Sequence, residues 1–154
     1  MKNGSVIQLI EYLNDKEPQE IEVARGVILN NLTNINEDYK ITFGWDVLAA
    51  CRCDTSWKAF RLRLADYLGT LSENDREHEA KKIQSEDDHW EWFNKSILLK
   101  RDEYKWFFFR SPNEIEAACL IYHPKQSALS TKNVFYIEFI AVAPWNRYLS
   151  LIHI

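Results

Sequence analysis

The chain has 154 residues, which is enough for one domain of ordinary size with a buried core. Its 46% hydrophobic and 27% charged residues are typical of folded globular proteins, and 4 glycines with 4 prolines argue against extensive disorder. The net charge of −4 supplies no general basic field, so neither nucleic acid nor a membrane surface is an expected partner.

The chain has the features of a cytoplasmic protein. No apolar run reaches the roughly 20 residues that a membrane-spanning helix needs, and the N-terminus lacks a basic segment followed by a long apolar stretch. Cys51, Cys53 and Cys119 are odd in number and form no disulfide framework, which predicts reduced thiols. Cys51 and Cys53 have no second pair at zinc spacing, so no metal is expected.

Residues 1–84 are predicted to form a helical region. Ser5 and Gln8 have the spacing of a capping box, Pro18 suits a first helical position, and Asp54 is placed to cap a third helix. The polar stretch 72–84 is predicted to be a solvated helix or a linker. Apolar residues at helical spacing mark the buried face of each helix: Val6, Leu9, Ile10 and Leu13, then Ile21, Ala24, Ile28 and Leu32, then Trp57, Phe60, Leu64 and Leu68.

The apolar period changes near residue 104. A helix capped at Ser85 runs to about Lys100, and three strands follow at 104–110, 117–123 and 135–142. The last strand is apolar on both faces except at Glu138, which predicts a central strand covered on both sides. The expected fold class is therefore α+β, with a helical N-terminal half followed by an antiparallel three-stranded sheet.

The third predicted strand ends in Ile140-Ala141-Val142-Ala143-Pro144-x-x-Arg147. This pattern, with the helix and hairpin before it, resembles the fourth strand and cofactor loop of the GNAT superfamily, the acetyl-CoA-dependent N-acetyltransferases. The resemblance extends over about residues 85–147. It implies an α/β/α-type fold, truncated here, with 85–148 as the N-terminal part of an acyltransferase domain. It also implies acetyl-CoA as co-substrate and a primary amine, on a small molecule or a protein, as acceptor.

The resemblance assigns cofactor contacts to particular residues. In the family the backbone of this strand pairs with the pantetheine arm, which places Ile140, Ala141 and Val142 beside the coenzyme; their side chains would fill the sheet core as well. Arg147 matches the first position of the Arg/Gln-x-x-Gly-x-Gly/Ala loop, whose N–H groups hold the pyrophosphate at a helix N-terminus. The glycines of that loop are absent here, so we expect the chain as written to bind coenzyme A poorly and to be an inactive fragment of the intact enzyme.

Glu138 is the predicted catalytic base. Transfer to an amine requires that the amine lose a proton, and a carboxylate within hydrogen-bond reach can take it. The alternatives are a partly solvated strand residue and a partner for a lysine. The isolation of Glu138 in an apolar strand favours a role, because an unpaired buried carboxylate is costly. Tyr122 and Tyr136 are more typical of sheet packing, so no general acid is assigned.

Residues 149–154 read Leu-Ser-Leu-Ile-His-Ile. This string is what a transposase-adapter end used in preparing sequencing libraries would encode. We expect them to be an artefact; the alternative is a genuine short apolar terminus.

A second functional hypothesis also stands. Residues 1–84 match nothing in the family pattern, so the chain would be a non-catalytic helical interaction or regulatory module on a degenerate GNAT scaffold. The oligomeric state is left open.

Overall fold

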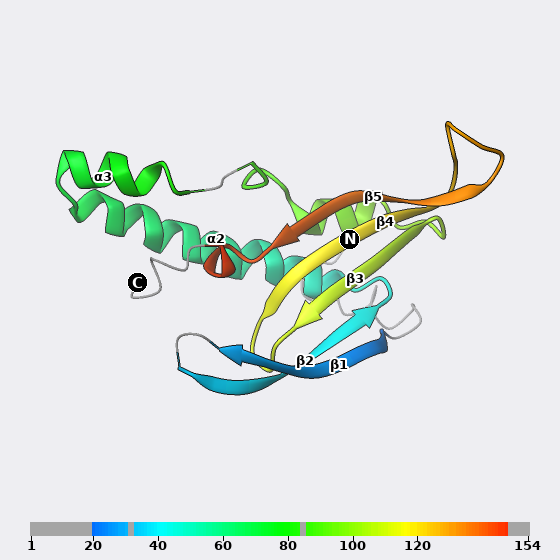
Figure 1. Ribbon diagram of the computed structural model, residues 1–154, viewed down its shortest axis with the longest axis horizontal. Coiled ribbons are helices and arrows are strands. Elements are labelled where there is room, and N and C mark those ends of the chain that lie inside the picture. Colours follow the sequence, from blue (N-terminus) through cyan, green and yellow to red (C-terminus); the bar gives the residue numbers. More distant parts are fainter. Residues whose placement is uncertain (1–19, 31–32, 84–85, 148–154) are drawn as a thin grey trace, which may run out of the picture.

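The computed structural model describes residues 20–30, 33–83 and 86–147. Its five strands form one antiparallel sheet in the order β1-β2-β3-β4-β5, with helices packed on one face (Figure 1). Among these residues, no helix has both the length and the apolar character needed to cross a bilayer. The elements are β1 (Ile21–Asn30), β2 (Ile35–Phe43), α2 (Val47–Thr70), α3 (Glu73–Ala80), α4 (Trp92–Leu98), β3 (Tyr104–Arg110), β4 (Ile115–Gln126), β5 (Asn133–Val142) and the 3-10 turn η1 (Pro144–Asn146).

The prediction of a helical N-terminal half is wrong for residues 20–43. Ile21, Ala24 and Ile28 recur at helical spacing, yet they lie in β1, which pairs along its length with β2. The same segment is rich in β-branched residues such as Val23 and Val27, which favour a strand. The sequence fits both a helix and a strand here. The hydrogen-bonded ladder with β2 selects the strand. The helix predicted after Ser5 lies outside the described residues.

The predicted three-stranded sheet is also wrong, because β1 and β2 extend it beyond β3. The three expected strands are present as β3, β4 and β5. However, β5 pairs only with β4 among the described strands, so it is an edge strand and not the central strand that was predicted. Eight of its ten residues are exposed. Its apolar character on both faces suggested two covering layers, whereas the described residues supply one.

The core lies between the sheet and the pair α2 and α4. Trp57 from α2, Trp92 from α4 and Trp106 from β3 are each at most 2% exposed. Neighbouring rings meet edge to face, with centroids 6.2 Å apart for Trp57 and Trp92 and 6.3 Å apart for Trp92 and Trp106. The Trp57 indole also donates to the carbonyl of Ile115 at 3.0 Å. Each buried ring stabilises the fold by roughly 2–3 kcal/mol, and together they join the helices to the sheet.

Helix α4 is capped by a residue from another helix. Asp54 was expected to cap its own helix, but α2 begins at Val47, where Asp46 is the N-cap. The Asp54 carboxylate instead accepts the backbone N–H groups of Trp92 and Phe93, each at 2.8 Å. The first turn of α4 therefore depends on α2. The predicted start of this helix at Ser85 falls outside the described residues, and 86–89 form a turn.

Candidate functional site

Glu138 occupies a β-bulge in β5. Leu120 pairs with Phe139 and Ile121 with Ile137, which leaves Glu138 as the extra residue of the strand. Bulges redirect side chains and are frequent beside active sites. The carboxylate is exposed, so the expected cost of a buried lone charge does not arise. Glu138 is therefore presented to solvent at an irregular point of an edge strand.

The three residues expected to contact coenzyme follow this bulge on β5. Ala141 is 3% exposed and packs toward the helices, whereas Ile140 and Val142 are 57% and 40% exposed on the opposite face. No strand among the described residues pairs with the outer edge of β5. Backbone N–H and C=O groups along such an edge can pair with an added extended chain.

Arg147 lies just beyond the turn η1 and is held by protein groups. Its two terminal nitrogens form a paired ion contact with both oxygens of Asp87, and its Nε donates to the carbonyl of Val142 at 2.9 Å. Asp87 is 8% exposed, so this is a largely buried ion pair. The Arg147 guanidinium was expected to bind the coenzyme pyrophosphate. Instead it joins the segment after β5 to the turn at 86–89.

Glu116 on β4 was not singled out in the sequence, although it organises the segment after β5. Its Oε2 accepts the Trp145 indole N–H and the Asn146 side-chain amide, both at 2.7 Å. Its Oε1 accepts the Ser111 hydroxyl at 2.6 Å. The only signal in the sequence is a charged residue between apolar neighbours in a strand. These bonds fix the path of the chain as it leaves β5.

Lys95 on α4 was also not recognised from the sequence. Its Nζ lies 3.7 Å from the ring centroid of Phe139 and 5.6 Å from that of Trp90. Phe139 directly follows Glu138, so the amine lies beside the bulge. Burial lowers the pKa of Lys95 below its usual 10.5, against the opposing attraction of nearby carboxylates.

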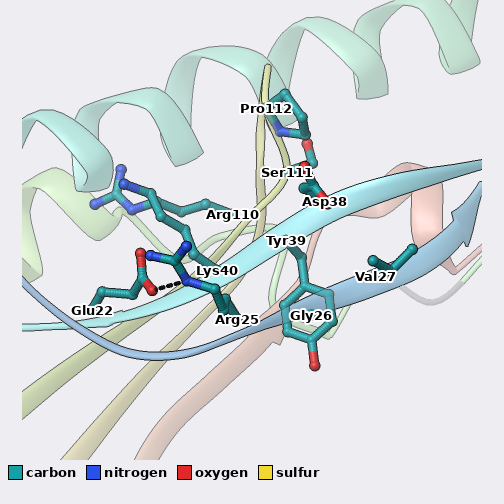
Figure 2. A pocket seen from close by; sticks show the side chains of 10 residues that line it. All are labelled: Glu22, Arg25, Gly26, Val27, Asp38, Tyr39, Lys40, Arg110, Ser111 and Pro112. Atoms are coloured by element: carbon teal, nitrogen blue, oxygen red, sulfur yellow. Dashed lines mark hydrogen bonds and ion pairs between the residues drawn. The ribbon is translucent and has the colours of Figure 1, made fainter.

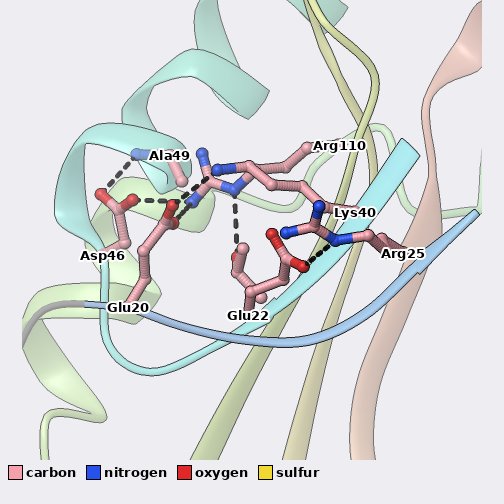
Figure 3. Close-up of polar contacts among 8 residues, drawn as sticks. Glu20, Glu22, Arg25, Lys40, Asp46, Ala49 and Arg110 are labelled. Carbon is pink, nitrogen blue, oxygen red and sulfur yellow. Dashed lines mark hydrogen bonds and ion pairs between the residues drawn. The ribbon is translucent and has the colours of Figure 1, made fainter. Parts of the chain in front are cut away.

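A pocket lies at the other end of the sheet, away from β5. A pocket of about 460 Å³ lies along the β1–β2 hairpin and is lined by Arg25, Tyr39 and Arg110 among others (Figure 2). Its charges are matched: Arg25 bonds Glu22 at 2.5 Å, and Arg110 contacts Glu20, Asp46 and Thr42 (Figure 3). The cluster fixes β1 against the N-terminus of α2. This balance of charge indicates a structural cluster and favours no charged ligand.

A second pocket, of about 410 Å³, lies where β2 ends and β3 begins, between Trp45 and Lys105. Neither pocket contains Glu138, Ile140, Ala141, Val142 or Arg147. In the described part of the chain, no three His, Cys, Asp or Glu side chains gather as metal ligands would.

Comparison of the chain with family models, curated proteins and solved structures gives no match.

Proposed function

We propose that the chain carries part of an N-acyltransferase, which moves an acetyl group from acetyl-CoA to a primary amine. The observation that carries the proposal is the outer edge of β5, unpaired among the described strands, with an exposed carboxylate bulging from it. The edge supplies backbone partners for an extended pantetheine arm. The bulged carboxylate supplies a base next to the same strand.

In this mechanism Glu138 accepts a proton from the acceptor amine, directly or through one water. Backbone N–H groups at the β5 edge donate to the thioester oxygen and stabilise the negative charge that develops there. The amine nitrogen bonds to the carbonyl carbon, the carbon–sulfur bond breaks, and the thiolate leaves.

The net charge of −4 mildly favours a cationic acceptor. The three free cysteines are consistent with a cytoplasmic location.

The residues fit the two halves of the coenzyme differently. The β5 edge suits the pantetheine arm, whereas Arg147 is engaged by Asp87 and no glycine follows it. We derive no pyrophosphate contact from this chain. Consequently, a short thioester such as acetyl-pantetheine should serve as well as acetyl-CoA, because the guanidinium expected at the pyrophosphate is already paired with Asp87.

The test measures thiol release from each thioester in the presence of a panel of primary amines. Because this chain is only part of the expected enzyme, turnover should be slow with both thioesters. Its kcat/KM should be comparable for the two and should fall by about 100-fold or more in Glu138→Gln. Glu103→Gln, which changes an exposed carboxylate on the turn before β3, is the matched control. Hydrogen exchange should show added protection along β5. Absence of both turnover and protection would remove the proposal.

The same edge favours one alternative. An extended peptide can add to an exposed strand, with backbone bonds giving affinity and alternate side chains giving specificity. The interaction module predicted from the sequence depended on a helical region, but residues 21–30 and 35–43 are strands. Peptide-induced protection of β5 without thioester turnover would favour this non-catalytic role.

A further inference from the structure

Lys95 stands out because its amine lies over aromatic rings beside the bulge. Its Nζ is 3.7 Å from the Phe139 ring centroid and is also near the face of Trp90. A lysine ammonium is strongly hydrated and usually extends into water. Here the aromatic faces replace part of that hydration. The amine is thereby held at a fixed place next to β5.

The charged groups facing this amine come from each of the packed elements. They are Asp54 on α2, Glu138 on β5 and Glu91 at the start of α4, and all three favour the protonated form. Burial outweighs them, so the pKa of Lys95 is lower than that of an ordinary lysine. Lys95 therefore has a larger fraction of neutral, nucleophilic amine near neutral pH than a fully solvated lysine has.

We infer that the ε-amine of Lys95 is an acyl acceptor within the chain, modified by the thioester that β5 binds. The inference rests on the proposed function and names one acceptor for that same site. Two observations carry it: the amine lies against Phe139, and the preceding residue is the bulged Glu138. A nucleophile and its base are thus supplied by adjoining positions on α4 and β5.

The reaction balances without any further reagent. The neutral Nζ attacks the carbonyl carbon of the thioester, an amide bond forms, and the carbon–sulfur bond breaks. Glu138 takes the proton released by the nitrogen, and the thiolate leaves and is protonated from solvent. The product is an uncharged acyl-lysine, which lacks the cation that Lys95 places over Phe139 and Trp90.

The experiment incubates the full chain with acetyl-CoA or acetyl-pantetheine and follows acetylation of each lysine by peptide mass spectrometry. Lys81 is the internal reference, because its side chain is 72% exposed and its ion pair with Glu77, at 2.8 Å, lies on the surface away from β5. We expect Lys95 to be acetylated about tenfold or more faster than Lys81. In Glu138→Gln the rate at Lys95 should fall while the rate at Lys81 is unchanged.

Two controls distinguish this from chemical acetylation by the thioester. In urea the two lysines should react alike, and Lys95→Arg, which keeps a cation for the aromatic faces, should remove the modified peptide without loss of the circular dichroism of the fold. Equal rates at Lys95 and Lys81 in the native chain, or no effect of Glu138→Gln, would overturn the inference. If added amines are acylated while Lys95 is not, only this inference fails. If no thioester is used at all, the proposed function fails with it.

Discussion

At the scale of single residues, two opposing effects act on the ionisation of the Asp54 carboxylate. It accepts two backbone N–H groups from α4, which favours the ionised form, but burial against α4 disfavours it. Burial is the larger influence, so the pKa of Asp54 is raised above its usual 3.8. The folded protein therefore binds this proton more tightly than the unfolded chain does.

A pH dependence of stability follows from Asp54. The contribution of this raised pKa to the free energy of unfolding is fully present below about pH 3.8. It is lost as the pH rises through the raised pKa. Asp54→Asn does not titrate, so the free energy of unfolding of the wild type minus that of the variant should fall as pH rises across this window. Urea unfolding at a series of pH values measures the difference. A difference that grows with pH would contradict the assignment.

At the scale of elements, the turn η1 is fixed by side chains from distant segments. Glu116 of β4 binds Trp145 and Asn146, and Asp87 binds Arg147. The Trp145 ring also meets Phe60 of α2 edge to face, with centroids 5.9 Å apart. The end of β5 is thus joined to β4, to α2 and to the 86–89 turn.

We predict that Glu116→Ala loosens this end of β5. The change leaves the Trp145 and Asn146 donors without their acceptor, which should lower the free energy of unfolding by about 1–3 kcal/mol. Hydrogen exchange should quicken in 143–147 more than in β3. Glu103→Ala, on an exposed turn, is the control and should change stability by less than about 0.5 kcal/mol. Equal effects of the two variants would show that Glu116 does not hold η1.

At the scale of the whole molecule, the sheet has one covered and one open face in the described part of the chain (Figure 1). The open face carries apolar residues aligned across four strands; most of them are partly exposed, and the two on β5, Ile140 and Val142, are 57% and 40% exposed. Contiguous apolar surface of this kind promotes association. The two aligned rows are Phe43, Phe107, Cys119 and Ile140, and Ile41, Phe109, Ala117 and Val142.

We therefore predict that the chain self-associates as its concentration rises. Ile140→Lys should weaken this association, because it places a charge at the end of one apolar row. Leu129→Lys is the matched control: it removes a side chain that is 97% exposed, but one that lies in the β4–β5 loop away from the rows. Light scattering coupled to size-exclusion chromatography measures both. A wild-type chain that stays monomeric at high concentration would refute the prediction.

The strands β3, β4 and β5 and the apolar stripe of α2 were predictable, because each depends on periodicity within a short segment. In contrast, Ile21, Ala24 and Ile28 fit a helix as well as a strand, and only pairing with β2 settled the choice. Glu138 could be selected as a lone acid in an apolar strand. Its exposure and its bulge could not be foreseen, since both depend on register with β4.

What the sequence by itself determined is therefore local: composition and the strand-forming segments near the C-terminus. The resemblance of 140–147 to an acetyltransferase motif stays a prediction. Tertiary structure alone decided that β5 lies at the edge of the described sheet, that Asp54 caps a helix 38 residues away, and that Arg147 pairs with Asp87. The physical reason is the range of the interactions. Hydrophobic periodicity is a property of neighbouring residues, whereas ladders, caps and ion pairs between distant segments exist only after the chain has folded.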